Sequence, residues 1–309
     1  MIKRTLVIEN PSQLSLRQEQ MLVRRIHEGE SSERTVPIED IGVLMLESEH
    51  CTITTALLTR LMERNVAVIG CDGKHMPVGL WLPLEGNTLQ SARFQMQIAT
   101  SLPLKKNVWA QLIKCKLENQ GEVLLRQQLE HAPLIRWASE VRSGDMDNFE
   151  ARGAAYYWNL LFEGQDFRRE RFGPPPNHLF NYGYAILRAI IARALVGSGL
   201  FPTFGVHHKN QYNAYCLADD VMEPYRPIVD AYILDHLHEM EVGEELTREW
   251  KLHLLKIPTL DVMLEKERRP LLIAASMTTS SLVKVLEGKE KKVLLPQFPK
   301  HEFRTNQRL

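Results

Sequence analysis

The spacing of hydrophobic residues along the chain changes near residue 84. Before it, short runs of β-branched and aliphatic residues alternate with polar turns, a pattern typical of strands. Polar, glycine-containing segments at 28–32 and 72–74 are suited to hairpin connections. The runs predict strands at residues 5–8, 21–26, 41–46, 66–69 and 78–82.

One helix is expected inside this strand-rich region. Thr54 or Thr55 can cap its N-terminus, because a threonine hydroxyl accepts a hydrogen bond from a free backbone amide in the first turn. The apolar residues that follow recur at helical spacing and would lie against a sheet: Leu57, Leu58, Leu61 and Met62.

From residue 88 onward, apolar residues recur every three or four positions, which predicts helices, the longest over 108–129 and 182–196. Leu84-Glu85-Gly86-Asn87 is the natural linker between the two patterns. The sequence therefore predicts an α+β fold. A small N-terminal β-rich domain, residues 1–84, precedes a larger all-α domain, residues 85–309.

Composition excludes several classes of protein. Of the 309 residues, 44% are hydrophobic and 25% charged, so the chain can bury a large core and is not globally disordered. Its 38 basic and 38 acidic residues cancel, so no field of the whole molecule attracts nucleic acid. No run of about 18 apolar residues predicts a membrane span, and the expected location is the cytoplasm. The four cysteines include no C-x-x-C pair, which favours reduced thiols over structural zinc.

Charges are nevertheless segregated along the sequence. Residues 164–209 carry six basic side chains against two acidic ones, whereas residues 219–250 carry ten acidic against two basic. A binding site for a polyanion is therefore expected to be local. Four basic side chains are candidate DNA phosphate contacts, although a charge run of this kind is more often a solvated surface: Arg168, Arg169, Arg171 and Lys209.

The first candidate for chemistry is Glu150. Asp145 and Asp147 mark the expected start of a helix, and the positions that follow Glu150 at helical spacing are apolar: Ala154, Tyr157, Trp158 and Leu161. A carboxylate at the head of an apolar stripe is costly to bury unless it is paired, hydrogen-bonded or bound to a cation. The alternative is a carboxylate at a helix N-terminus that the helix dipole stabilises.

The second candidate is the pair His207 and His208. They lie on a loop with glycines and a proline, after a helix expected to end near Gly197 and Gly199. Such a loop can direct an imidazole inward without the constraint of a helix. An isolated histidine is more often a hydrogen-bonding residue than a ligand, so the pair alone does not decide the matter.

The third candidate is an acidic segment around residues 219–224. On a helix, Asp220 and Glu223 are three positions apart and lie on one face, so both could face one cation. Pro224 disfavours a standard helical conformation at Glu223, so the helix can end or kink there and turn that carboxylate away.

One imidazole with two or three carboxylates suits Mg²⁺ or Mn²⁺. Both ions take hard oxygen ligands, and manganese tolerates an imidazole more readily. Zinc fits less well, because no second histidine or cysteine occurs at a recognised spacing. Beside a basic stretch, such a site would suit phosphodiester chemistry, in which a metal polarises the phosphoryl oxygen.

Seven segments also form one ordered pattern that covers nearly the whole chain. They are residues 65–69, 77–83, Trp109 with 116–120, the helix of Glu150, 179–184, 205–208 and 217–227. Together they resemble the CRISPR-associated integrase family that acts in spacer acquisition, often called Cas-one. The segment Met222-Glu223-Pro224-Tyr225-Arg226-Pro227 most resembles the type II branch of that family.

The resemblance implies an antiviral-defence enzyme whose β-rich N-terminal domain dimerises and whose helical domain is catalytic. It implies a homodimer that assembles with a smaller CRISPR-associated partner dimer, and the type II effector nuclease is a further expected partner. The substrate would be double-stranded DNA. With a divalent metal, the 3′-hydroxyl of a short duplex (spacer) would attack a phosphodiester of the CRISPR array, and water in its place would make the same site an endonuclease.

Position by position, the family's metal-binding glutamate matches Glu150, its histidine matches His208 and its later acidic ligand matches Glu223. Asp220 is a possible additional acidic ligand. His207 directly precedes the matched histidine, which leaves open which ring is the ligand, and the last ligand is a glutamate where many relatives have aspartate. The resemblance thus implies a catalytic metal site of Glu150, His208 and Glu223 with Mg²⁺ or Mn²⁺.

Two other functions stay open at this point. The first is a metal-dependent DNA repair nuclease that cuts without integrating. The second is a non-catalytic DNA-binding scaffold subunit, in which Glu150 and Glu223 are structural members of ion pairs.

Overall fold

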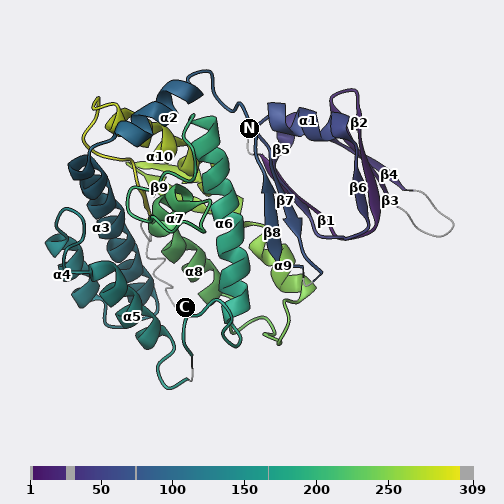
Figure 1. Ribbon diagram of the computed structural model, residues 1–309. Helices are drawn as coiled ribbons and strands as arrows, with labels where there is room; N and C mark the ends of the chain where they lie inside the picture. Colours follow the sequence, from purple (N-terminus) through teal and green to yellow (C-terminus); the bar gives the residue numbers. More distant parts are fainter. Residues whose placement is uncertain (1–2, 26–31, 74, 166, 300–309) are drawn as a thin grey trace.

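The computed structural model describes residues 3–25, 32–73, 75–165 and 167–299. Strands fill the N-terminal part and helices most of the rest, so the mixed α and β content expected from the sequence is confirmed (Figure 1). The N-terminal elements are β1 (Arg4–Ile8), β2 (Ser12–Arg17), β3 (Gln20–Arg25), β4 (Glu33–Pro37), β5 (Ile41–Leu46), β6 (Cys51–Ile53), α1 (Thr55–Glu63), β7 (Ala67–Cys71) and β8 (Pro77–Trp81).

Two four-stranded sheets form in this part. In the first, of order β1-β5-β7-β8, the first three strands are parallel and β8 is antiparallel to β7; the second has the order β4-β3-β2-β6. All five predicted strands are present within one or two residues at either end. The sequence did not predict β2, β4 and β6, because their short runs mix polar and apolar residues. The turn expected at 28–32 lies outside the described residues except for Ser32. Of the turn expected at 72–74, Lys74 lies outside them.

The helix predicted after the threonines is α1. Thr54 caps it, since its Oγ1 accepts from the backbone amide of Leu57 at 3.4 Å. Leu57 and Leu61 are fully buried and pack with the inner faces of both sheets. The apolar stripe expected from the sequence therefore closes the core of the N-terminal part.

The first sheet is covered on both faces. Leu44 of β5 packs into the core under α1, whereas its neighbours Val43 and Met45 point the other way, into the core of the helical part. A strand buried on both faces carries a continuous apolar run instead of alternating, which explains the sequence of β5. The hydrophobic core is thus continuous from the first sheet into the helices.

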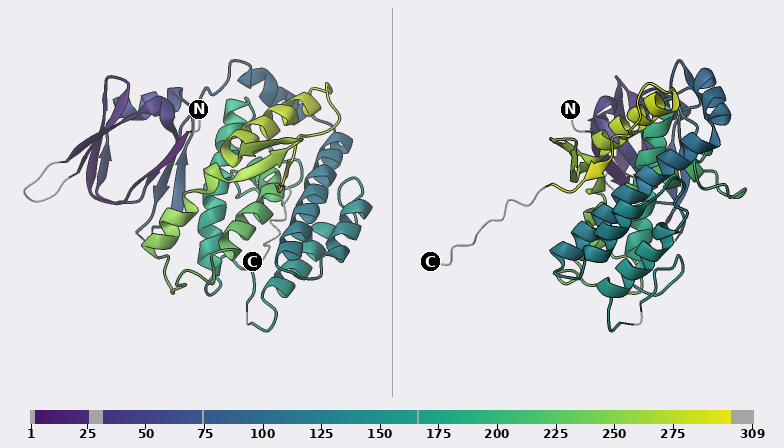
Figure 2. Two further views of the ribbon diagram at one scale, coloured as in Figure 1. Left: turned by 180° about the vertical axis from the view of Figure 1, so that it is seen from behind. Right: turned by 90° about the vertical axis from the view of Figure 1, so that its left-hand side faces the viewer.

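The second part is built mainly of helices. Figures 1 and 2 show α6 running between the first sheet and α3, with α8 alongside. Its helices are α2 (Gln90–Ala99), α3 (Leu102–Arg126), α4 (Ala132–Glu140), α5 (Phe149–Leu161), α6 (Asn177–Gly197), α7 (Cys216–Met222), α8 (Arg226–Leu234), α9 (Arg248–Leu254) and α10 (Leu271–Leu286). By length and composition α6 could cross a membrane, but 78% of its most apolar window is buried inside the protein, as in the central helix of a packed core.

The expectation of an all-α second part was wrong in one respect. Three short strands form a sheet of order β10-β9-β11: β9 (Asp261–Leu264), β10 (Glu267–Pro270) and β11 (Pro296–Gln297). Glu265 and Lys266 form a tight turn between the first two strands, and Glu265 has a positive φ of 58°. Strands of two to four residues are too short for a period of two to be distinguished from a helical period.

Candidate active site

Glu150 lies in the first turn of α5, where the sequence placed it. Asp145 caps this helix, because its two carboxylate oxygens accept from the backbone amides of Phe149 and Glu150, each at 2.9 Å. One turn on, Gly153 lets α5 approach α3 closely, since a Cβ there would stand 2.3 Å from Leu117 Cδ2. The helix contact directs Glu150 toward the side chains of α3.

Asp220 of α7 fixes the conformation of the loop that carries the two histidines. Its carboxylate is fully buried and accepts from the backbone amides of Val206 at 2.7 Å, His207 at 3.0 Å and His208 at 3.2 Å. Its Oδ1 also lies 2.6 Å from Nδ1 of His208. Both oxygens of Asp220 therefore bond to the loop. The expectation that Asp220 and Glu223 face one cation is wrong, because the Asp220 carboxylate is directed at the histidine loop instead.

The contact with Asp220 also determines the chemistry of His208. The hydrogen bond raises the pKa of His208 above its ordinary value, against the opposing effect of burial. Because Nδ1 bonds to the carboxylate, Nε2 is the nitrogen left to face the site, as is common for metal-binding histidines. Gly205 is required for this loop, since a Cβ there would lie 2.3 Å from the carbonyl oxygen of His208.

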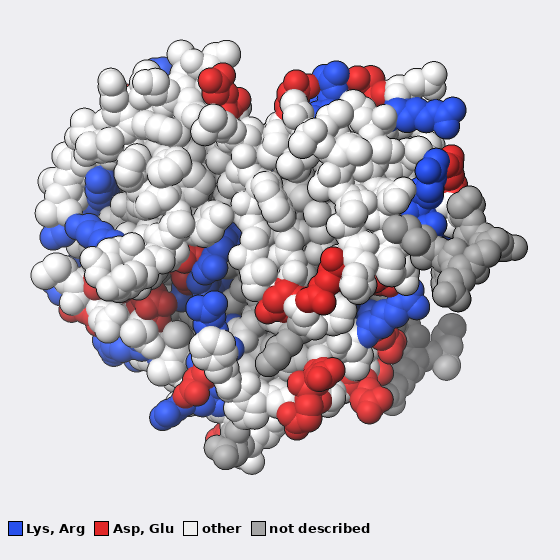
Figure 3. Space-filling model, turned by 45° about the vertical axis from the view of Figure 1, so that its right-hand side comes forward, with Lys and Arg blue, Asp and Glu red and all other residues white. Residues whose placement is uncertain are grey.

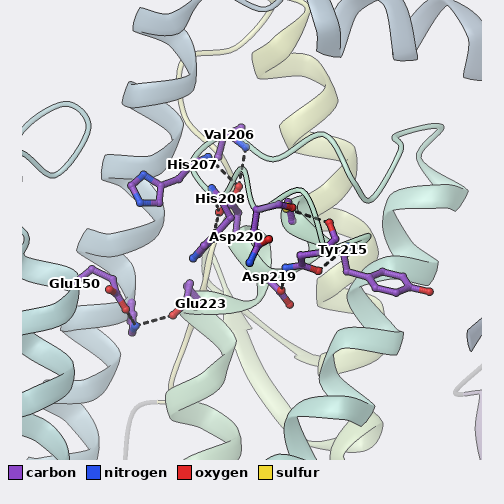
Figure 4. A network of polar contacts seen from close by, with 12 residues as sticks. Glu150, Val206, His207, His208, Tyr215, Asp219, Asp220 and Glu223 are labelled. Carbon is purple, nitrogen blue, oxygen red and sulfur yellow. Dashed lines mark hydrogen bonds and ion pairs between the residues drawn. The ribbon is translucent and has the colours of Figure 1, made fainter. Parts of the chain in front are cut away.

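His207 occupies a different environment. Its ring stacks on the indole of Trp109 with 4.0 Å between ring centroids and 4° between planes. Burial lowers the pKa of His207 below its ordinary value. Figure 4 shows this ring turned aside toward α3, whereas the ring of His208 points toward Glu223. The geometry therefore favours His208 over His207 as the site imidazole.

Glu223 begins a 3-10 turn, Glu223–Tyr225, that separates α7 from α8. The helix thus ends before Pro224, as the sequence allowed. The carboxylate is 5% exposed and forms ion pairs with Lys116 at 2.6 Å and Arg226 at 3.1 Å. Burial alone would raise the pKa of Glu223, but the two cations beside it hold the pKa below its ordinary value.

Lys116 of α3 joins the two glutamates. Its Nζ donates to Glu150 Oε1 at 2.5 Å and lies 2.6 Å from Glu223 Oε2, so one ammonium contacts both carboxylates. Burial would lower the pKa of Lys116, but Glu223 and Glu150 raise it above its ordinary value. Lys116 lies in one of the seven segments that resemble the family, but no local pattern in the sequence indicated a role for it.

The donor set fits a hard divalent cation. Figure 4 shows Glu150, His208 and Glu223 facing one another from α5, the loop before α7 and the turn after it. Oε2 of Glu223 is buried and has no hydrogen-bond donor among the described residues, although Lys116 lies within ion-pair distance. In the described part of the chain, no three His, Cys, Asp or Glu side chains form a ready ligand cluster. Two carboxylates are nevertheless the hard ligands that magnesium and manganese prefer, and manganese also accepts an imidazole.

A cavity of about 640 Å³ opens beside this site. Lys116 and Glu150 belong to its wall. Four arginines and three large aromatic residues also line it: Arg168, Arg169, Arg171, Arg226, Trp158, Phe167 and Tyr184. On the face in Figure 3, charges of both signs occur and no field of one sign covers the surface, in agreement with the zero net charge. The arginines of this cavity therefore gather locally, beside the carboxylate of Glu150.

The four predicted phosphate contacts do not lie in equivalent places. Arg168 is 86% exposed at the cavity. Arg169 is already bound within the protein, since its guanidinium donates to the amide oxygens of Asn177 at 3.0 Å and Asn181 at 2.9 Å. Lys209 is exposed on the histidine loop and is not part of the cavity wall. Arg168 and Arg171 are therefore the two freest of the cavity arginines that the sequence singled out.

Asp230, also in the cavity wall, is a buried carboxyl group that the sequence analysis missed. Oδ1 accepts from the hydroxyl of Tyr184 at 2.5 Å and Oδ2 from that of Tyr157 at 3.2 Å. Burial raises the pKa of Asp230 to about 7, although its polar neighbours oppose this: Tyr184, Arg169, Tyr157 and Arg226. No motif or spacing marked this position, because its partners lie far away in the sequence.

This pKa predicts a pH-dependent stability. Between its unfolded value near 3.8 and about 7, Asp230 keeps a proton in the folded state that it loses on unfolding. The free energy of unfolding should therefore fall as pH rises through this window, by up to about 1.4 kcal/mol per pH unit. Urea denaturation of the parent and of Asp230→Asn at pH 4 to 8 measures the difference. A difference that is constant over this range would contradict the assignment.

Two carboxylates and an imidazole beside an arginine-lined cavity are the groups that an enzyme would need to act on phosphate esters with a divalent metal. The family model "CRISPR associated protein Cas1" matches residues 5–266. The chain is 37% identical over 298 residues to the CRISPR-associated endonuclease Cas1 of Neisseria meningitidis serogroup C (strain 8013), covering 95% of this chain and 96% of the relative. The chain belongs to the Cas1 family, and the family predicted from the seven segments is confirmed.

Solved structures agree with this assignment at the level of the fold. A casposase bound to integration product superposes with a TM-score of 0.78 at 19% identity, covering 95% of this chain and 92% of the other. A Cas1 protein from Thermotoga maritima gives a TM-score of 0.74 at 16% identity, over 97% and 100% of the two chains. Since the chain belongs to the Cas1 family, and its relatives are named CRISPR-associated endonucleases, a nuclease or integrase of that class is confirmed at the level of the family. The ligands of the metal are not decided by these comparisons.

Proposed function

We propose that this protein is a metal-dependent DNA endonuclease and integrase that inserts short duplexes into a CRISPR array. The observation that carries the proposal is the convergence of Glu150, His208 and Glu223 from three separate elements beside an arginine-lined cavity. The curated relative is named an endonuclease, and one structural neighbour is a casposase bound to an integration product. Within the family we place the chain in the type II branch, on the sequence of residues 222–227.

Mg²⁺ or Mn²⁺, when bound, would supply a Lewis acid at the phosphoryl oxygen. Glu150, Glu223 and Nε2 of His208 would hold the ion, and Asp220 orients the imidazole by its bond to Nδ1. Exposed Arg168 and Arg171 would bind the DNA phosphates and align the 3′-hydroxyl with the target phosphodiester. The same alignment with water in place of the hydroxyl gives cleavage.

We also propose how the chain assembles with itself and with partners. Residues 1–84 are proposed as the dimerisation domain and residues 85–309 as the catalytic domain. A neighbour is titled as a complex of Cas6-RT-Cas1 with Cas2, and this chain covers 35% of that longer protein at a TM-score of 0.71. We therefore propose a homodimer that binds a Cas2 dimer and double-stranded DNA, with the type II effector nuclease as a further partner. The proposed location is the cytoplasm.

One assay separates the three functions. The purified protein is incubated with its Cas2-type partner, a labelled DNA duplex, supercoiled plasmid and Mg²⁺ or Mn²⁺. We expect label covalently attached to the plasmid, and no attachment once a chelator is added. Cut plasmid without attached label would indicate the repair nuclease instead. Absence of both products, together with unchanged DNA binding after chelation, would indicate the scaffold.

The arginines of the cavity are tested by salt dependence. Replacing both Arg168 and Arg171 with alanine should weaken duplex binding by about tenfold at 150 mM salt, because each phosphate contact releases a bound counterion. The slope of log affinity against log salt should fall by nearly two. Fluorescence anisotropy at several salt concentrations measures it, and Arg136→Ala is a control because this exposed residue of α4 does not line the cavity. An unchanged slope would remove both residues from the interface.

A further inference from the structure

Lys116 stands in the position where a metal ion would bridge the two glutamates. Its ammonium contacts Glu150 Oε1 at 2.5 Å and Glu223 Oε2 at 2.6 Å, and only 7% of the side chain is exposed. A divalent ion held by the same oxygens would need contacts of about 2.1 Å to each. The ammonium and the ion cannot both occupy this space, and two cations so close together would repel strongly.

The negative charges of the two glutamates explain why a lysine lies between them. Glu223 is buried and Glu150 about two-thirds buried, and two carboxylates that face each other without a cation destabilise a folded protein. Arg226 contacts the other oxygen of Glu223 and compensates only part of this charge. Lys116 therefore stabilises the site before a metal arrives, in the manner of an internal counterion.

The structure also offers a place for the displaced ammonium. Gln120 lies four residues after Lys116 on α3, and both side chains line the 640 Å³ cavity. The Oε1 of Gln120 is buried and has no hydrogen-bond donor among the residues that the structure describes. Residues four apart on a helix are neighbours, and the lysine side chain has a flexible four-carbon stem. Gln120 Oε1 is therefore an available hydrogen-bond acceptor for the ammonium, one helical turn from Lys116.

We propose that Lys116 is a resident counterion, which the divalent cation displaces from the two glutamates toward Gln120 and the cavity. There the ammonium joins the arginines that face a DNA phosphate. This inference rests on the proposed metal site of Glu150, His208 and Glu223. It adds that metal binding includes the exchange of one cation for another, so that the affinity for metal is lower than the carboxylates alone would give.

Calorimetric titration with Mn²⁺ in the absence of DNA tests the exchange. Lys116→Met keeps most of the length of the side chain but removes its charge, and it should bind Mn²⁺ at least about tenfold more tightly than the parent. Lys114→Met, an exposed residue on the same helix, should bind as the parent does. Equal or weaker binding by Lys116→Met would overturn the inference while leaving the metal site in place. No binding by either the parent or Lys116→Met would overturn the proposed metal site and the inference with it.

A second measurement uses the parent protein, so it holds even if Lys116→Met does not fold. Lysines are acylated briefly with a water-soluble reagent, with and without Mn²⁺, and each site is quantified by mass spectrometry. The ammonium of Lys116 should react at least several times faster with Mn²⁺ present, because it is released from its two carboxylates, whereas Lys114 should not change. Equal labelling of Lys116 in both conditions, at a Mn²⁺ concentration that saturates the parent, would overturn the inference.

Discussion

Glu150→Gln is expected to lower DNA joining by at least about a thousandfold while leaving the protein folded. The substitution keeps the size of the side chain and its contact with Lys116, but it removes the negative charge that a divalent cation requires. His208→Ala and Glu223→Gln should each have an effect of similar size, and the double variants little more, because the three groups act as one site. The rate of covalent attachment of labelled duplex to plasmid, measured with magnesium and with manganese, gives these values.

Two control variants make this test specific. Glu163→Gln changes an exposed carboxylate just beyond the same helix and should join DNA at the parent rate. His207→Ala removes the imidazole that stacks on Trp109 and should retain joining. Normal joining by a Glu150, His208 or Glu223 variant would exclude that residue from the site. An inactive His207 variant beside an active His208 variant would show that the other ring binds the metal.

Asp220→Ala is expected to lower the free energy of unfolding by about 2–4 kcal/mol. The variant leaves the backbone amides of residues 206–208, one buried and two partly buried, without their acceptor, and each unsatisfied donor is costly. It also frees the ring of His208, so joining should be lost as well. Urea denaturation monitored by tryptophan fluorescence measures the first effect.

Asp147→Ala is the matched control for this loss of stability. Asp147 is paired with Arg142 at the surface at 2.8 Å, with Arg142 well exposed and Asp147 about one-third exposed, so its removal should cost less than about 1 kcal/mol. If Asp220→Ala were as stable as Asp147→Ala, the histidine loop would not depend on the buried carboxylate.

The strands and helices that position the site could be predicted well from the sequence. The helical spacing of apolar residues and the capping aspartates located the helix of Glu150, and Pro224 indicated the end of α7. These features can be recognised in the sequence because they depend only on neighbouring residues. The role of Asp220 could not be found in this way. Its spacing from Glu223 suggested a shared cation, but its hydrogen-bond donors lie in an irregular loop 12 to 14 residues earlier.

Lys116 was missed for a related reason. It is 34 residues from Glu150 in the sequence, and it lies on a helix that is buried on several sides, so no polar face singles it out. Local patterns report which residues share an element, whereas this ion pair arises from the packing of α5 and the turn after α7 against α3. The short strands β9 to β11 escaped prediction because their pairing, too, depends on contacts between distant segments.

The two-sided burial of β5 has a consequence for truncation. Val43 and Met45 are part of the same core as the helices, so a fragment that begins at residue 85 would expose an apolar flank of α6 to water. Such a fragment should aggregate or misfold. Deleting the N-terminal residues therefore cannot reveal whether they join two copies of the chain, and single substitutions on their outer surface are the informative way to ask.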